Sequence, residues 1–174
     1  SQSYKDKGFD LKLRLFEESK YLPSLAVGLR DLAGSNTFEA EYFVASKYLR
    51  NFDLTLGMGW GDLSYGSLRN PLDLFFDANN RQLETTGQGG EFSTKRYFRG
   101  NVGIFAGIEY FIPNFKGVRL KLEYDSTNYL AEAFGEGRAA SNFAYEKVRD
   151  AQSRFDFGFV YPLSKSFEIK TSFI

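Results

Sequence analysis

The chain has 174 residues, in which 22 basic and 22 acidic side chains balance to a formal net charge of zero. A nucleic-acid partner would require a basic surplus, so none is expected. Cysteine and histidine are both absent, which excludes disulfides, thiolate nucleophiles, histidine-dependent catalytic triads and the common zinc ligand sets. No cofactor and no metal site are predicted, and no apolar run is long enough for a transmembrane helix.

Eight segments alternate apolar with polar residues, the pattern of a β-strand that has one apolar and one polar face. The aromatic content is 18% and 17 residues are glycine, a composition that favours a β-barrel over a helical bundle. In chain order the predicted strands are Phe9–Glu17, Ser24–Arg30, Thr37–Lys47, Phe52–Trp60, Asn101–Phe111, Val118–Asp125, Arg154–Tyr161 and Phe167–Phe173.

The connections between these strands alternate in length. They are short after every odd-numbered strand and longer after the even-numbered ones, and residues 61–100 and 126–152 are interpreted as long external loops. Outer-membrane barrels combine short periplasmic turns with long external loops in this way, whereas a compact soluble domain rarely contains so long a structureless connection. The sequence therefore predicts an antiparallel, up-and-down transmembrane β-barrel.

The same alternation predicts where the ends of the region lie. The first strand leads into a short turn and the last strand follows one, so both ends are expected on the external side. A complete bacterial barrel normally begins and ends on the periplasmic side. Residues 1–174 are therefore expected to be one barrel region within a longer chain, an arc of a barrel with more than eight strands.

The apolar faces are assigned to lipid, because eight rows of large side chains would overfill the interior of a small barrel. The alternatives are a sandwich or a soluble, lipocalin-like barrel that holds an apolar ligand inside. The predicted lipid-facing residues are Leu11, Leu13, Leu54, Leu56, Ile104, Ile108, Leu120, Leu122, Phe157 and Phe159.

Aromatic residues near the strand ends are assigned to the girdles that membrane barrels place at the two interfaces. These are Tyr42, Trp60, Tyr110, Tyr124 and Tyr161.

The polar faces would line the lumen, where cations can contact acidic sugars and carboxylates can accept hydrogen bonds from hydroxyl groups. The alternative is that these charges only pair with one another across strands. The candidate ligand-binding residues are Arg14, Arg30, Glu39, Glu41, Arg119, Lys121 and Glu123.

The third predicted strand contains two glutamates, Glu39 and Glu41, whose side chains are assigned to the same face. Its apolar face is assigned to Phe38, Ala40, Tyr42 and Val44, and its polar face to Glu39, Glu41 and Lys47. The pairs Glu39/Glu41 and Glu123/Asp125 have the spacing of glycosidase carboxylates, roughly 6–7 Å along a strand. Such pairs are also common on polar barrel faces, so the protein is not expected to be an enzyme.

A family resemblance rests on six stretches that occur in a fixed order along the chain. They are Gly8–Leu15, Leu25–Leu32, Glu41–Lys47, Leu56–Gly61, Gly107–Tyr110 and Lys121–Asp125. Together they resemble the YjbH/GfcD-like family of outer-membrane proteins linked to exopolysaccharide or capsule export. The resemblance implies a barrel in the outer membrane of a Gram-negative bacterium, in contact with lipid, polysaccharide and other secretion proteins. It supplies no catalytic motif. The expected function is to assist export or surface anchoring of an exopolysaccharide, with a general porin-like barrel as the alternative.

Overall fold

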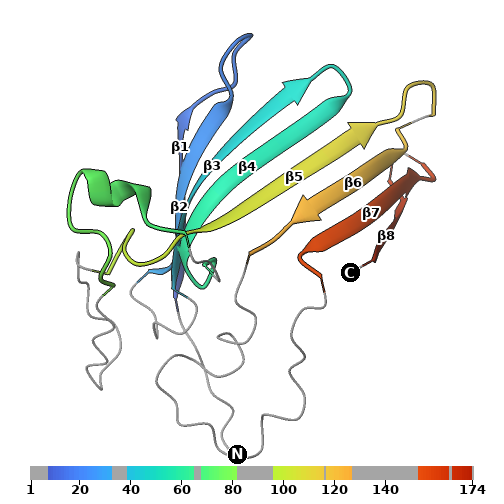
Figure 1. Ribbon diagram of the computed structural model, residues 1–174. Helices are drawn as coiled ribbons and strands as arrows, with labels where there is room; N and C mark the ends of the chain where they lie inside the picture. Colours follow the sequence, from blue (N-terminus) through green and yellow to red (C-terminus); the bar gives the residue numbers. More distant parts are fainter. Residues whose placement is uncertain are drawn as a thin grey trace, which may run out of the picture.

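The computed structural model describes residues 8–32, 39–64, 68–81, 96–115, 117–126, 153–164 and 166–173. They form one antiparallel sheet in which the eight strands are neighbours in chain order (Figure 1). This confirms the predicted all-β, up-and-down architecture. No helix in the described part of the chain is long and apolar enough to cross a membrane. The strands are β1 (Phe9–Phe16), β2 (Ser24–Leu32), β3 (Ala40–Leu49), β4 (Phe52–Gly61), β5 (Gly103–Phe111), β6 (Arg119–Tyr124), β7 (Phe155–Pro162) and β8 (Glu168–Phe173).

Short turns join the strands at one end of the sheet, which we call the turn end, and the longer connections lie at the other, the loop end (Figure 1). The β3–β4 turn is the tightest of those described, because Leu49 pairs with Phe52 and only Arg50 and Asn51 lie between. Arg50 has a φ of 54°, in the left-handed region that two-residue hairpin turns use. A turn this short fixes the register of the whole β3–β4 pair.

The two faces of the sheet differ in side-chain size and polarity. Directly opposed residues of an antiparallel pair share a face. Ile108 is opposed by Leu54 and Leu122, whereas its neighbour Gly107 is opposed by Thr55 and Glu123. One face therefore carries large apolar side chains, and the other carries small and charged ones.

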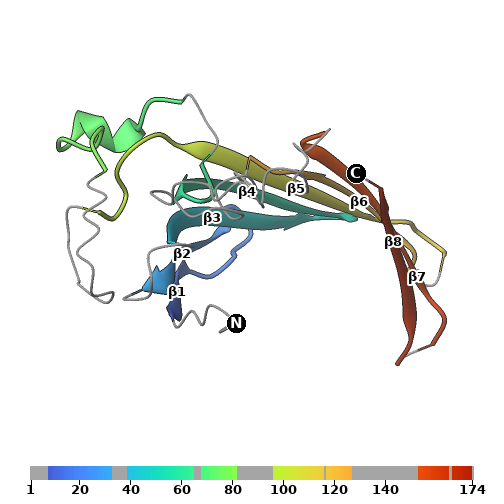
Figure 2. The same ribbon diagram turned by 90° about the horizontal axis from the view of Figure 1, so that it is seen from below.

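The sheet is an arch (Figure 2). The small and charged side chains lie on its inner, concave side, where they line a pocket. Large side chains on one face and glycines on the other favour this curvature, because strands can approach closely only where side chains are small. The apolar residues therefore lie on the convex side, where Leu56 is 60% exposed and Phe157 is 58% exposed. All ten residues predicted to face lipid lie on this convex face.

The sheet is open. Within the described residues β1 pairs only with β2, and β8 pairs only with β7. The two edge strands lie apart, at opposite ends of the arch (Figure 2). An arc of eight strands agrees with the predicted strand number, and the strands do not close on themselves.

The assignment of faces in the third predicted strand was wrong. Glu41 is opposed by Trp60 on β4 and Leu29 on β2, so it lies on the convex face. Tyr42 is opposed by Gly59 and Gly28 and lies on the concave face. The reason is the register fixed by the β3–β4 turn, which places the apolar run 42–45 half on each face. Glu39 lies on the same side of the sheet as Glu41, and Lys47 is also on the convex face. Thr37 and Phe38 lie outside the described residues.

Trp60 and Tyr42 are therefore not girdle residues. Trp60 is fully buried, because part of the 61–100 connection folds back over it. That connection contains one 3-10 turn, η1 (Pro71–Leu74), which lies on the convex side of the arch (Figure 2). Within the predicted long loop 61–100, residues 68–81 and 96–100 are thus folded onto the sheet, and the predicted strand Asn101–Phe111 begins two residues later, at Gly103. Apart from Ser126, the predicted loop 126–152 lies outside the described residues.

Candidate functional site

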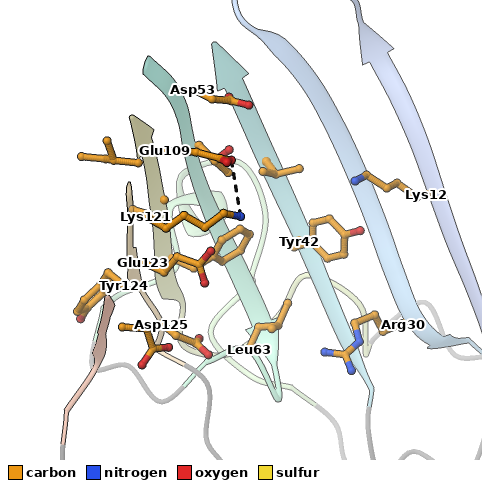
Figure 3. A pocket seen from close by; sticks show the side chains of 17 residues that line it. Lys12, Arg30, Tyr42, Asp53, Leu63, Glu109, Lys121, Glu123, Tyr124 and Asp125 are labelled. Carbon is orange, nitrogen blue, oxygen red and sulfur yellow. Dashed lines mark ion pairs between the residues drawn. The ribbon is translucent and has the colours of Figure 1, made fainter. Parts of the chain in front are cut away.

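The concave face contains a groove of about 770 Å³ that crosses the arch from β1 to β7. Figure 3 shows Glu109, Lys121, Glu123 and Asp125 on one side of the groove and Lys12 and Arg30 on the other. Leu63, just after β4, lies near the loop end of the groove (Figure 3). The groove is open to solvent and has both charged and aromatic walls.

The groove is hollow because small residues occupy the concave positions of its central strands. Two aromatic rings lie flat in the space that glycines leave. A Cβ built on Gly28 would come within 2.2 Å of the Tyr42 ring, and one on Gly57 within 2.0 Å of the Phe105 ring. The two rings meet edge to face, with centroids 6.3 Å apart. Together Tyr42 and Phe105 form an aromatic floor on an otherwise polar face.

The two walls of the groove differ in net charge, and Lys121, the cation on the acidic wall, is paired with Glu109. Lys12 and Arg30, on β1 and β2, have no ion-pair partner among the described residues. On the opposite wall Glu123 and Asp156 are directly opposed across β6 and β7. Like charges in this position destabilise a sheet, so the pair is available for a hydroxyl or cationic ligand group. The groove is therefore basic on one wall and acidic on the other.

Towards the turn end, the charges pair with one another. Arg119 Nε lies 3.2 Å from Glu109 Oε1, and its Nη2 lies 2.6 Å from Glu168 Oε2. Lys121 Nζ lies 3.6 Å from the other Glu109 oxygen (Figure 3). These cations form the cross-strand pairs that the sequence analysis kept as an alternative to ligand binding. Of the predicted cations, Arg30 is the one most available to a ligand.

The seven candidate ligand-binding residues separate into two groups in space. Arg14, Arg30, Arg119, Lys121 and Glu123 lie on the concave face as predicted. Glu39 and Glu41 do not, because they belong to a buried cluster at the loop end of the convex face. The Glu39/Glu41 pair therefore has no access to the groove.

We call this second constellation the docking cluster: Glu39, Glu41, Arg81 and Arg96. Arg81 donates two hydrogen bonds of 2.9 Å to the two carboxylate oxygens of Glu41, a bidentate pair. Arg96 Nη2 donates to Glu39 Oε2 over 3.0 Å, and Arg81 lies 3.4 Å from the same oxygen. Two negative and two positive groups thus neutralise one another in a buried site.

Three aromatic rings seal the docking cluster from water. Trp60 packs on Phe43 and Phe98 with ring centroids 5.9 and 5.3 Å away, and Phe43 and Phe98 are themselves 5.3 Å apart. The backbone N–H of Phe98 donates to Glu41 Oε2 over 3.0 Å, which joins the ring cluster to the ion pairs. The convex face at this end is therefore a small closed core.

Asn70 holds the folded part of the 61–100 connection together. Its side-chain amide donates to the carbonyl oxygens of Ala78 and Phe98, and its Oδ1 accepts from the N–H of Leu72 at the start of η1. Leu68 also forms a bridge with Val102, just before β5. We call residues 68–81 and 96–102 the docked module.

Two pKa values in the docked module reflect its burial. Burial lowers the pKa of Arg81, but the hydrogen bonds and charges of Glu41 and Glu39 outweigh it, so the pKa is raised and the guanidinium stays charged. Burial raises the pKa of Tyr97, and the nearby Glu39 carboxylate raises it further. The phenol is therefore held in its neutral form.

Arg81, Arg96, Asn70 and the concave position of Phe105 were not predicted from the sequence. One available signal was the two-residue turn after β3: paired residue numbers then sum to 101, so Glu41 must oppose Trp60. No comparable signal identifies Arg81 or Arg96, because they lie in a segment without periodicity. Among the described residues, no group of three or more acidic, cysteine or histidine side chains is placed to hold a metal.

Fold and groove together define a class: an all-β meander whose concave face is polar and whose convex face is apolar. The family YjbH, described as "Exopolysaccharide biosynthesis protein YbjH", matches residues 1–174. The chain therefore belongs to this exopolysaccharide biosynthesis family, and the predicted resemblance is confirmed.

One curated relative is the "Uncharacterized lipoprotein YjbH" of Escherichia coli (strain K12), which is 46% identical over 143 residues. The match covers 82% of this chain and 20% of the relative. The chain thus spans about a fifth of the length of that relative. No solved structure matches the chain.

Proposed function

We propose that the chain is part of a β-barrel in the outer membrane of a Gram-negative bacterium and that it assists export or surface anchoring of an exopolysaccharide. In this proposal the convex face contacts lipid and the concave groove contacts the sugar chain. The observation that carries it is the distribution of side chains: the apolar residues cover the outside of the arch and the polar residues its inside. A soluble barrel would have the opposite arrangement.

Strand length supports the membrane placement. A strand that crosses a bilayer needs about 9–11 residues, tilted by roughly 45°. The central strands β2, β3, β4 and β5 have 9, 10, 10 and 9 residues. Their convex residues are exposed although they are large and apolar; Leu56, for example, is 60% exposed and Ile108 is 43% exposed. Contiguous apolar surface of this kind usually marks an interaction site, and here lipid would cover it.

The groove supports the choice of polysaccharide. Sugar rings combine apolar faces with hydroxyl groups, and they suit a site with aromatic rings beside charged hydrogen-bonding groups. Tyr42 and Phe105 supply the rings, Arg30 a cation, and Glu123 and Asp156 the acceptors. The family description and the lipoprotein relative support a role in the cell envelope. The chain covers a fifth of that relative, so in this proposal the rest of the barrel wall would be formed by other parts of the full-length protein.

The test compares a substitution that narrows the groove with a control substitution of the same size on the convex face. Thr55 and Leu56 are neighbours on β4, but Thr55 lies on the concave face and Leu56 on the convex face. In the full-length protein, Thr55→Trp should reduce the exopolysaccharide released per cell, whereas Leu56→Trp should leave it unchanged. The amount of each variant in the outer membrane is measured in the same cells. Equal release from both variants at equal protein levels would contradict the proposal.

A further inference from the structure

The docked module places apolar side chains where nothing in the described part of the chain covers them. Leu74 is 86% exposed and Phe75 is 82% exposed, in and just after η1, and the neighbouring Phe76 is 44% exposed. These three consecutive residues form the apolar tip of the module. Large apolar side chains with this much exposure are usually partnered when they are contiguous.

The position of the tip is set by the docking cluster. Glu41 and Glu39 bind Arg81 and Arg96, so the connection after β4 is drawn back over the convex face instead of continuing away from the sheet. Figure 2 shows η1 on the convex side of the arch, and Figure 1 shows it beside the loop end of the sheet. The tip thus projects sideways from the outside of the arch, near the level where the strands end.

Aromatic residues elsewhere at the loop end of the convex face indicate what surrounds the strand ends at the level of the tip. At the loop end, the convex face carries Tyr124 and Phe155, whose rings pack 5.2 Å apart. Aromatic residues at this position of a membrane barrel mark the boundary between headgroups and acyl chains. If the convex face contacts lipid as proposed, the tip continues the lipid-contacting surface outward along that boundary.

The cations around the tip are held in contacts within the module, while the carboxylate of Asp77 is exposed to solvent. Arg69 forms an ion pair with Asp73 at 2.5 Å, and this pair holds the pKa of the Asp73 carboxyl below its usual range. The Arg99 guanidinium lies over the Phe76 ring, 5.5 Å from its centroid, and also donates to the Asp77 carbonyl oxygen. Paired charges at the base and an apolar tip are typical of segments that lie in the membrane interface.

We propose that the docked module is a membrane-interface anchor, which inserts Leu74, Phe75 and Phe76 into the lipid boundary around the barrel. The partner is the lipid bilayer itself. This inference rests on the proposed membrane function but goes beyond it, because it assigns lipid contact to a loop. The ion pairs of Glu39 and Glu41 are the device that fixes the loop in this orientation.

The test uses nitroxide labels on single cysteines in the full-length protein, reconstituted in vesicles of outer-membrane lipid. The described chain contains no cysteine, so Phe75→Cys, Ile108→Cys and Arg50→Cys each give one label within it. Ile108 lies on the convex strand face, and Arg50 lies at the turn end. Collisions with oxygen, which concentrates in lipid, and with a water-soluble nickel chelate report the depth of each label.

The label at position 75 should favour oxygen, as does the one at 108, at a depth of roughly 5–10 Å inside the headgroup region. Adding Arg81→Gln should move label 75, but not label 108, into water. A label 75 that meets nickel while label 108 meets oxygen would overturn the anchor and leave the membrane placement standing. If label 108 also meets nickel, the proposed function fails and the anchor fails with it. A label 75 shielded from both reagents would show that protein, not lipid, covers the tip.

Discussion

Removing one partner of the Glu41–Arg81 ion pair should destabilise the docked module, because both groups are buried and their hydrogen bonds are bidentate. Glu41 is fully buried, and the Arg81 side chain is 12% exposed. Removing one partner of such a pair leaves an uncompensated charge and costs about 3–5 kcal/mol. Arg81→Met would leave Glu41 with the Phe98 N–H as its remaining partner in the described structure.

The protein can escape this cost by releasing the docked module, so the effect should appear as local opening. A loss of about 3–5 kcal/mol corresponds to an increase in the opening equilibrium on the order of 10²–10⁴-fold. Hydrogen exchange measures it at the N–H groups of Phe98 and Gly100, which are bonded to Glu41 and Ala78 in the docked state. Exchange within β4 and β5 should change little.

The matched control removes both charges together. A buried pair replaced by apolar residues of similar volume is often neutral in stability, so Glu41→Leu with Arg81→Met should recover most of the lost protection. If the double variant opens as readily as Arg81→Met alone, the cost does not come from an unpaired Glu41. If neither variant changes exchange at Phe98, the cluster does not hold the module and our reasoning is refuted.

Three further outcomes follow from the same structure. Gly57→Val should destabilise the folded protein by about 1–3 kcal/mol, because the valine side chain would overlap the ring of Phe105. Gly107→Ala should be nearly neutral, because its added Cβ meets nothing closer than 3.9 Å. Denaturant unfolding of both variants checks this. Because the pKa of Tyr97 is raised, its contribution to the stability of docking is fully present below the unfolded value of about 10 and is lost as the pH rises through the folded value. Tyrosinate absorbance should therefore show one late-titrating group that Tyr97→Phe removes. Arg30→Gln should weaken binding of a polyuronate about tenfold without affecting a neutral dextran, as expected for one lost charge-assisted hydrogen bond, and equal loss for both sugars in binding assays would exclude Arg30 as a carboxylate contact.

Strand existence was predictable because alternation extends over six to ten residues in each segment, and the phase of seven segments is unambiguous. The sequence does not determine which face of β3 is apolar, because Tyr42, Phe43, Val44 and Ala45 are four consecutive apolar residues. Pairing with β4 through the Arg50–Asn51 turn determines which face of β3 is convex. This pairing involves two strands, so the sequence of β3 alone does not reveal it. The sequence analysis relied on the acidic residues of β3 and so reversed its faces.

The docked module was unpredictable for another physical reason. Its stability comes from a few polar contacts between residues far apart in sequence, such as Arg96 with Glu39 and Asn70 with Phe98. Periodicity reports only which face of a regular element is buried, and the module has no regular element beyond one 3-10 turn. The concave floor was missed similarly, because Phe105 is apolar and only the glycine opposite it makes room for a ring on the polar face.

Glu41 and Lys47 also indicate how far an apolar band can extend across the sheet. Among the residues paired in the described ladders, they are the only charged ones on the convex face. Each is neutralised by a connection that folds over the strand ends: Glu41 by Arg81, and Lys47 by Glu18 at 3.2 Å and by the Ser19 carbonyl. They lie six positions apart along β3, which corresponds to roughly 20 Å, close to the band of about 25 Å that a membrane barrel presents to lipid. Two separate connections thus cover the two charges that the described ladders place on the convex face, and they do so at opposite edges of the same band. A protein whose convex face contacted water would gain little from covering either charge, so the membrane proposal explains both contacts with one cause.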